Sequence, residues 1–153
     1  MLPRTMKAVQ ITTGPLERRR ADDYDPDFCA PSGATWINCD YPRTPGASRV
    51  GQMYGWVPGE HMGNSEQYLH FVLARNWPEA KAAARAAVVA AGRGDRYLHM
   101  ACGHGLYRSP ACASIAAIAL HRHGYAVHVR HVALEARAPV WGAVRVRPHR
   151  PHP

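Results

Sequence analysis

A short segment between Ala101 and Pro110 concentrates residue types that can bind an oxyanion. Glycine lets the backbone turn sharply and approach a ligand closely, and consecutive N–H groups in such a turn form a concave nest for anions. The planar fork of an arginine can hold two phosphate oxygens at once. The segment therefore predicts a site for a phosphate group or a similar oxyanion. The residues concerned are the thiol-bearing Cys102, the glycines Gly103 and Gly105, the guanidinium-bearing Arg108 and the hydroxyl-bearing Ser109.

The elements on either side of this segment are expected to orient it. Residues 97–101 favour a strand, and residues 110–122 favour a helix that Ser109 caps and Pro110 opens. The N-terminus of such a helix carries free N–H groups and a partial positive charge, both directed at the preceding loop. The expected ligand-binding residues of this loop are Gly103, His104, Gly105, Leu106, Tyr107, Arg108 and Ser109.

Cys102 opens a Cys-x5-Arg-Ser spacing, which is the spacing of cysteine phosphatases. In those enzymes a thiolate attacks phosphorus while loop amides and the arginine hold the oxygens. A helix N-terminus and a nearby arginine favour the thiolate form of a cysteine. The alternative is a small residue buried at the end of a strand, which is common for cysteine. Both roles stay open, and Cys102 is catalytic only under the first.

Further strands and helices around this unit predict an α/β fold. Alternating apolar residues predict strands over 6–12, 34–39 and 126–131, and helices are expected over 65–75 and 78–91. The strand, helix and strand around the loop form a unit whose connection should be right-handed and whose strands should be parallel. We therefore expect one domain with a small, mostly parallel sheet of about four strands flanked by helices.

The other segments carry fewer signals of regular structure. Residues 42–63 are rich in Gly and Pro, and a connection of this length without structure of its own is usually functional or mobile. Whether these residues cover the site stays open. The polar run 17–27 is expected to be a solvated loop. The α/β domain is expected to span residues 1–138, and residues 139–153, rich in Pro, Arg and His, are expected to form a disordered basic tail.

Four further residues are expected near the ligand because of where their strands end. In a parallel sheet the carboxyl ends of the strands meet at one edge, where open α/β sheets bind ligands. Arg130 and His131 end the last predicted strand, and Asp40 and Arg43 follow the second. We expect these four side chains to supply additional contacts to the anion.

Composition narrows the classes of partner. The 153 residues carry a formal net charge of +8, with 17 arginines and 2 lysines, which favours anionic partners, although a GC-rich genome also writes Arg for Lys. No C-x-x-C pair and no Walker A motif occurs, so neither a zinc ribbon nor ATP hydrolysis by a P-loop is expected. No apolar run follows Met1, so we expect a cytoplasmic protein with no membrane partner. No metal is expected, because no histidine or cysteine pattern typical of metal ligands occurs, and no cofactor is expected. The oligomeric state, including a homo-oligomer, stays open.

The segment from Cys102 to Ser109, the alanine-rich residues after it and the segment 129–135 resemble the C-terminal domain of RapZ, the RNase adapter protein. That family has a Cys-x-Gly-Gly-x-His-Arg-Ser loop, a helix, and a strand ending in a His-Arg-x-Leu-type segment. The resemblance covers residues 97–137 well, and the earlier part agrees in outline. The positions that match the family pattern are Cys102, Gly105, Arg108, Ser109, His131 and Leu134.

This chain departs from the RapZ pattern at several positions. Gly103 stands where the family has Thr, His104 replaces the first of its paired glycines, and Tyr107 replaces the His before the arginine. Residues 12–15 (TTGP) replace a Ser-Phe-Gly-type segment after the first strand. The oxyanion cradle depends on backbone N–H groups and on Arg108, which these departures leave in place.

RapZ proteins join a P-loop ATPase domain to a C-terminal domain that binds an amino-sugar phosphate and a small RNA and presents that RNA to a ribonuclease. Resemblance to the C-terminal part alone implies a stand-alone module that binds a phosphorylated small molecule, either a sugar phosphate or a nucleotide. It also implies an RNA-binding or regulatory role through the Arg-rich surface. A binding function, and not an enzymatic one, is therefore the first hypothesis.

Two other hypotheses stay open. Low-molecular-weight tyrosine phosphatases share a Cys-x5-Arg-Ser-Pro segment that opens a helix, which makes a Cys102-dependent phosphatase the second hypothesis. In that family a catalytic Asp-Pro comes well after the loop, whereas Asp25-Pro26 precedes it here. The third hypothesis is RNA binding by charge alone, with an affinity that falls steeply with salt and does not depend on Arg108. It relies on the tail arginines Arg145, Arg147 and Arg150.

Overall fold

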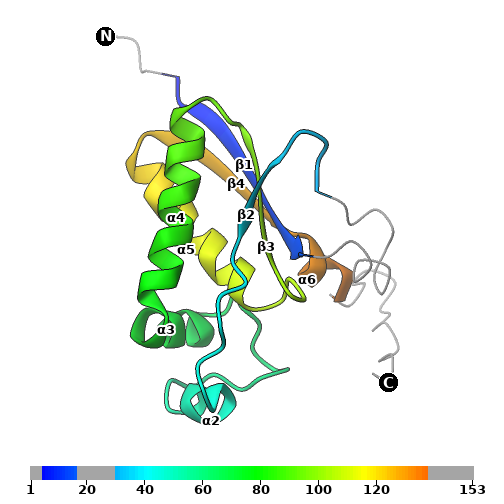
Figure 1. The fold of residues 1–153 in the computed structure, drawn as a ribbon, viewed down its shortest axis with the longest axis vertical. Helices are drawn as coiled ribbons and strands as arrows, with labels where there is room; N and C mark the ends of the chain where they lie inside the picture. The colour runs from blue at the N-terminus through cyan, green and yellow to red at the C-terminus, as the bar shows by residue number, and fades with distance from the viewer. Residues whose placement is uncertain (1–4, 17–29, 138–153) are drawn as a thin grey trace.

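The computed structural model describes residues 5–16 and 30–137, and within these ranges it is an α/β fold built on one four-stranded sheet (Figure 1). The strand order is β2-β3-β1-β4 and every neighbouring pair is parallel. The expected fold class is thereby confirmed. The strands are β1 (Lys7–Pro15), β2 (Thr35–Asn38), β3 (Tyr97–Cys102) and β4 (Tyr125–His131).

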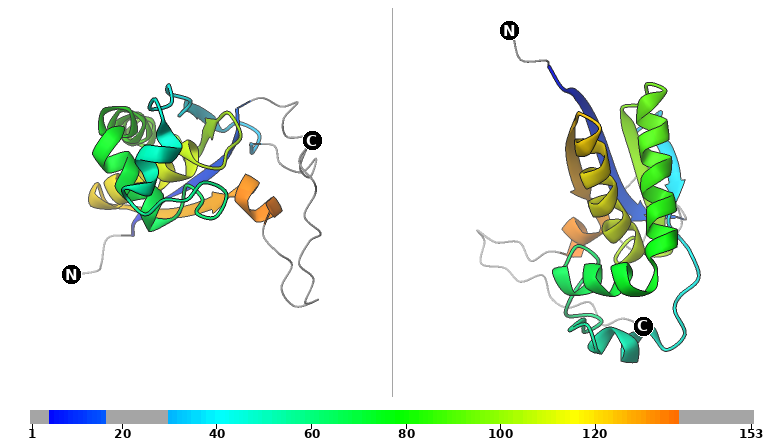
Figure 2. Two further views of the ribbon diagram at one scale, coloured as in Figure 1. Left: turned by 90° about the horizontal axis from the view of Figure 1, so that it is seen from below. Right: turned by 90° about the vertical axis from the view of Figure 1, so that its left-hand side faces the viewer.

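Five helices accompany the sheet in the described part of the chain. Helices α4 and α5 pack against each other and on the same side of the sheet, while α3 lies across the end of α4 (Figures 1 and 2). Among the described residues, no helix is long and apolar enough to cross a bilayer. The helices are α2 (Ala47–Gln52), α3 (Glu66–Arg75), α4 (Trp77–Gly92), α5 (Arg108–Arg122) and α6 (Val132–Arg137).

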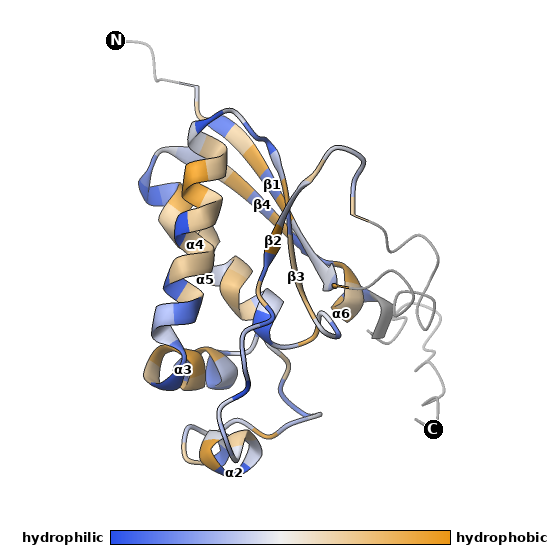
Figure 3. Cartoon of the chain, in the orientation of Figure 1, coloured by the Kyte–Doolittle hydropathy of each residue, from blue (hydrophilic) through white to orange (hydrophobic). Residues whose placement is uncertain are grey.

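The core lies between the sheet and the α4–α5 pair. Val9 and Ile11 of β1 are fully buried, and so are Leu98 and Met100 of β3 to within 1%. Burying one such side chain contributes about 1.5–3 kcal/mol. The helices meet the sheet mainly through alanines, which allow a close approach, and Figure 3 shows apolar residues concentrated on the strands and on α4 and α5. The buried alanines are Ala80, Ala83, Ala84, Ala87, Ala90, Ala91, Ala111, Ala113 and Ala116.

The predicted element boundaries hold for most of the chain. Ser65 caps α3 as its sequence context suggests, because its hydroxyl accepts the Tyr68 N–H at 3.2 Å. Two short helices were not expected: α2 within the Gly- and Pro-rich segment, and α6 after β4. The polar run 17–27 and the tail 139–153 lie outside the described residues.

β1 extends to Pro15, past residue 12, where the sequence predicts the strand to end. Gly14 pairs with Ala101 and Pro15 with Cys102 at the end of β3, so the neighbouring strand extends β1. The N–H of Gln10 donates to the Arg96 carbonyl and the N–H of Leu16 to the Cys102 carbonyl, both at 2.8 Å, so even-numbered residues of β1 donate to β3 and the ladder does not need an N–H from Pro15. The extension brings the end of β1 beside the loop that follows Cys102.

His99 of β3 makes the stability of the fold depend on pH. The side chain is 2% exposed, its Nδ1 lies 2.7 Å from Thr12 Oγ1, and burial lowers the pKa of His99 to about 4. The unfolded chain binds this proton near pH 6.5. Between pH 6.5 and 4 the unfolded state therefore holds more protons than the folded state, so stability falls as the pH is lowered through this window.

We expect His99→Gln to remove about 3 kcal/mol of this acid-induced loss, since each pKa unit corresponds to about 1.4 kcal/mol. Urea unfolding at pH 7, 5.5 and 4 measures the difference. His128→Gln, at an exposed position of β4, is the matched control and should keep the wild-type slope. Equal slopes in both variants would remove His99 as the cause.

Candidate anion-binding site

The loop between β3 and α5 is held against the end of β1 at the carboxyl edge of the sheet. Gly105 has φ +72°, a left-handed conformation that favours glycine. A Cβ on Gly105 would lie 2.4 Å from the carbonyl carbon of Gly14, which is backbone and cannot move aside. Glycine is therefore required at this position for two separate reasons, and the loop path is fixed by contact with β1.

The start of α5 differs from the expectation, because the helix begins at Arg108 and Ser109 does not cap it. Ser109 is fully buried in the first turn, and both of its polar groups face the thiol of Cys102. Its N–H donates to Cys102 Sγ at 3.3 Å, and its Oγ lies 3.3 Å from the same sulfur. The predicted cap is wrong, because the Ser109 hydroxyl contacts the Cys102 sulfur and forms no hydrogen bond to a free N–H group of the helix. Ser109 thus acts on Cys102 and not directly on the loop amides.

Arg108 points inward from the first turn of α5, with its side chain only 14% exposed. Its Nη2 lies 2.7 Å from Asp40 Oδ1, and its Nη1 donates to the carbonyl of Tyr41. The same Asp40 oxygen accepts the N–H of Gly103 at 2.9 Å. Asp40 therefore occupies two of the donors expected to hold a ligand oxygen, and it stands in the place of an anion.

Other donors of the loop remain available. Among the described residues, no hydrogen bond is formed by the backbone N–H groups of Gly105, Leu106 and Tyr107. These three amides lie just before the N-terminus of α5, where the helix dipole favours negative charge. Asp40 therefore uses the Gly103 N–H and one nitrogen of Arg108, while the N–H groups of residues 105–107 form no hydrogen bond within the described part of the chain.

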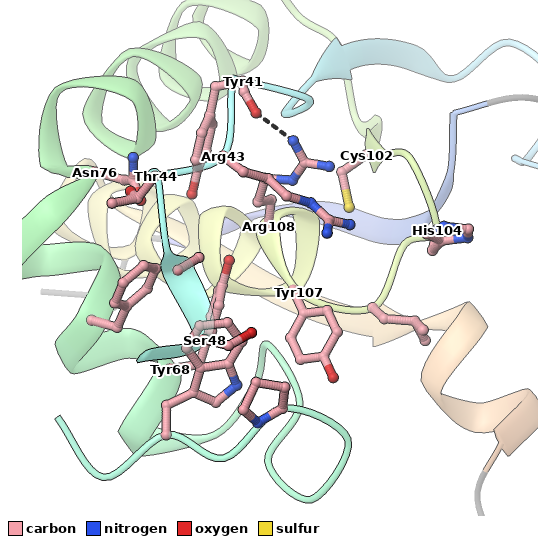
Figure 4. Close-up of a pocket in the computed structure, with 15 residues that line it drawn as sticks. Tyr41, Arg43, Thr44, Ser48, Tyr68, Asn76, Cys102, His104, Tyr107 and Arg108 are labelled. Atoms are coloured by element: carbon pink, nitrogen blue, oxygen red, sulfur yellow. Dashed lines mark hydrogen bonds between the residues drawn. The ribbon is translucent and has the colours of Figure 1, made fainter. Parts of the chain in front are cut away.

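A pocket of about 120 Å³ adjoins this loop (Figure 4). Arg43, Arg108 and Cys102 all line the pocket, and Figure 4 shows both guanidinium groups on the side of the pocket that holds the sulfur of Cys102. Arg43 is exposed and forms no ion pair with any other described residue. Two cations and one carboxylate, Asp40, leave the pocket with a net positive charge.

The segment 42–63 forms the opposite wall of the pocket and is not without structure. The ring of Trp56 packs on α2 at Gly51, where a Cβ would lie 2.0 Å from the ring. The segment is joined to the loop by two hydrogen bonds, from Gly63 N–H to the Leu106 carbonyl at 2.8 Å and from Gly59 N–H to Tyr107 Oη at 2.7 Å. These contacts make it a fixed side of the site in this structure.

The predicted site residues divide into two groups. Arg43, Cys102, His104, Leu106, Tyr107 and Arg108 all line the pocket. Asp40, Gly103 and Ser109 contact these residues directly, as described above, and Gly105 shapes the loop between them.

The residues at the end of β4 lie apart from the pocket lining. Arg130 Nε pairs with Glu135 Oε2 at 2.8 Å. His131 Nδ1 lies 2.9 Å from Thr13 Oγ1, and burial lowers the pKa of His131. Arg130 and His131 are not among the residues that line the pocket, and β1 lies between their strand and β3, from which the loop extends.

Sequence reasoning missed most of the aromatic side of the pocket. The pocket-lining rings of Trp56, Tyr68 and Phe71 come from the segment 42–63 and from α3. Nothing in their spacing connects them to Cys102, because they converge only when α3 packs under α5.

Comparison of the chain with protein-family models, with curated proteins and with solved structures gave no match.

We expect Asp40→Asn to tighten the binding of phosphate about 5-fold. Asparagine keeps an oxygen for the Gly103 N–H but removes the negative charge, and a charge repulsion at 4 Å costs about 1 kcal/mol in water. Isothermal titration with phosphate measures the change. Asp95→Asn is the matched control, since Asp95 pairs with Arg93 in the connection between α4 and β3, at the opposite end of β3 from the loop. No gain over this control would make Asp40 a fixed part of the cradle and not a competitor.

Proposed function

We propose that this protein binds a phosphorylated small molecule, a sugar phosphate or a nucleotide, in the pocket between the 102–109 loop and the segment 42–63. The observation that carries the proposal is that two arginines, Arg43 and Arg108, line one pocket, and that α5 begins at this pocket with Arg108. A phosphate dianion would compensate both cations, where Asp40 compensates only one.

The expected affinity is modest. A small ligand held mainly by charge-assisted hydrogen bonds should bind in the micromolar to millimolar range, on the order of 4 to 8 kcal/mol. In keeping with the resemblance to the RapZ C-terminal domain, we propose that the protein acts in the cytoplasm as a stand-alone regulatory module. RNA contact through its arginines belongs to the same proposal.

The test is a titration of the wild-type protein with inorganic phosphate, a sugar phosphate and a nucleoside monophosphate. The melting temperature should rise with ligand concentration, as binding to the folded state requires. The unphosphorylated sugar and sodium chloride of equal ionic strength are the controls. Shifts that the salt control reproduces would contradict a specific site.

One observation favours a second candidate, a Cys102-dependent phosphatase. Cys102 lines the pocket, and its sulfur accepts the Ser109 N–H at 3.3 Å, so a nucleophilic atom lies beside the first turn of α5. The thiolate would form a bond to phosphorus while the bond to the leaving oxygen breaks, and that oxygen needs a proton. Asp40 is the carboxyl group in contact with this loop. Asp25-Pro26 lies outside the described residues.

Hydrolysis of an aryl phosphate separates the two candidates. An enzyme would release phosphate in the wild type, and Cys102→Ser would abolish release while keeping phosphate binding. Absence of turnover in the wild type would remove the enzyme hypothesis and leave the binding proposal untouched.

A further inference from the structure

The edge strand β2 carries backbone groups that have no partner. The N–H of Cys39, just after β2, donates to the Ala101 carbonyl at 2.7 Å, so the odd-numbered residues here face β3. Because the direction of these groups alternates along a strand, the N–H and C=O groups of Trp36 and Asn38 point away from the sheet. They form no hydrogen bond with any other described residue, and β2 has a neighbouring strand on one side only. Such an edge is a template for pairing with another chain.

A groove of about 470 Å³ runs between this edge and α4. Figure 2 shows β2 at the end of the sheet beside α4. Trp36 lines the groove with 52% of its side chain exposed, and the helix contributes small side chains, Ala82 and Ala86 among them. Glu79 is the one charged residue among the described residues of the lining. A chain with a net charge of +8 thus presents a nearly uncharged surface here, where two copies repel each other little.

The outer side of α4 is self-complementary in charge. Residues spaced by three or four along α4 share one stripe of its surface. The residues of this stripe are Glu79, Ala82, Ala86, Val89 and Arg93. Val89 is 58% exposed and gives apolar surface to bury. Glu79 and Arg93 lie at opposite ends, so in an antiparallel pair of α4 helices centred near Ala86 each Glu79 faces Arg93 of the other copy. The intrachain pair of Arg93 with Asp95 leaves the arginine side chain 60% exposed.

The strand edge and the helix stripe fit the same second copy. Around a twofold axis at Ile37, β2 lies antiparallel to its copy and Trp36 is opposite Asn38. Each such pair exchanges two N–H···O bonds. Helices α4 and α5 cover the four strands, about two strands for each helix. With strands about 4.8 Å apart, the two α4 helices then follow each other at about 10 Å, the usual distance between packed helices.

We propose that this chain forms a symmetric dimer through β2 and α4, which joins the two sheets into one. Twofold symmetry is the commonest arrangement of identical chains. An extended peptide from another protein would satisfy the same backbone groups of β2, but it would leave the α4 stripe, Val89 included, exposed. A second copy covers both surfaces at once. The dimer does not depend on phosphate binding, so either proposal can fail without the other.

Sedimentation velocity of the full chain over a series of concentrations tests the dimer. A species of twice the mass of the chain should grow with concentration. A chain that stays monomeric up to about 500 µM would overturn the proposal and leave the groove to another partner.

Amide hydrogen exchange followed by nuclear magnetic resonance locates the contact. The N–H groups of Trp36 and Asn38 should exchange more slowly as the protein concentration rises, because pairing with the second copy removes them from water. The amides of β4, the opposite edge strand, are the internal control and should exchange at a constant rate. A dimer that leaves the two β2 amides unprotected would use a different surface and would overturn the proposal.

A charged substitution on the stripe should break the dimer. Ala86→Arg places two arginines face to face across the axis, and we expect a dissociation constant at least about 10-fold higher, because like charges brought together at an interface oppose association. Ala74→Arg adds the same side chain at an exposed alanine of α3, outside the groove lining, and should leave the dimer unchanged. Equal effects of the two variants would contradict the α4 contact. If Ala86→Arg fails to fold, the exchange of the wild-type β2 amides decides.

Discussion

Replacing Arg108 by alanine is expected to weaken phosphate binding about 100-fold, since truncating a buried, hydrogen-bonded charge typically costs about 2–5 kcal/mol. The side chain is 14% exposed and is held by Asp40 and the Tyr41 carbonyl, so its fork is already oriented toward the loop. Its removal would also leave the Asp40 carboxylate beside the Gly103 N–H without a cation, and that carboxylate repels an anion. Titration of each variant with inorganic phosphate measures the loss.

Two further variants make this prediction specific. Arg108→Lys keeps the charge but loses the planar fork, and we expect a loss of about 10-fold, between wild type and alanine. Arg85→Ala removes the same charge from an exposed position of α4 outside the pocket lining and should change the affinity little. If Arg108→Ala lost no more affinity than Arg85→Ala, binding would depend on overall charge, as the RNA hypothesis requires.

Replacing Gly105 by alanine is expected to lower the free energy of unfolding by about 4 kcal/mol, from left-handed strain of about 1–2 kcal/mol and overpacking of about 1–3 kcal/mol. Its φ is +72°, and the added Cβ would lie 2.4 Å from the backbone of Gly14. Relief would require the loop to move away from β1 and would displace Arg108. Urea unfolding monitored by far-ultraviolet circular dichroism measures the change.

Gly94→Ala is the matched control for this effect. Gly94 has φ +106°, but a Cβ there would meet no atom within 4 Å. Its substitution should therefore cost only the backbone strain, about 1–2 kcal/mol. Equal losses in the two variants would mean that contact between the loop and β1 does not constrain the site. A larger loss at Gly105, together with weaker phosphate binding, would show that this contact supports the cradle.

Asp40 satisfies donors of the loop within the protein itself. Asp40 places a carboxylate oxygen 2.7 Å from Arg108 and 2.9 Å from the Gly103 N–H, so two donors are satisfied before any ligand arrives. A ligand oxygen must then replace this oxygen or bind beside it, using the amides from Gly105 to Tyr107. Loss of the Asp40 charge favours the anion in both modes, so the Asp40→Asn experiment measures how strongly the carboxylate opposes binding.

Local sequence was sufficient for the parts of the fold that depend on neighbouring residues. The four strands, the long helices and the Ser65 cap follow from apolar periodicity and from capping chemistry, which act over a few residues. The position of the 102–109 loop between a strand and a helix was also predictable, since strand, glycines, arginine and helix are contiguous in the chain, whereas the path of the loop depends on its contact with β1. The start of α5 was not predictable, because the Ser109 hydroxyl could bond either to the helix N-terminus or to the Cys102 sulfur. In the folded chain it lies against the sulfur.

Strand order and the composition of the pocket were decided only by the tertiary structure. The sequence places Arg130 and His131 at the correct edge of the sheet, but β1 pairs between β3 and β4 and so separates them from the pocket lining. Trp56 and Tyr68 reach Tyr107 across gaps of 51 and 39 residues in the numbering, and no local signal spans such distances. The sequence by itself determined a glycine-rich loop between a strand and a helix of a parallel sheet, because those features depend on residues close together in the chain. The charge balance and the aromatic wall required long-range packing, which brings together side chains whose positions along the chain are unrelated.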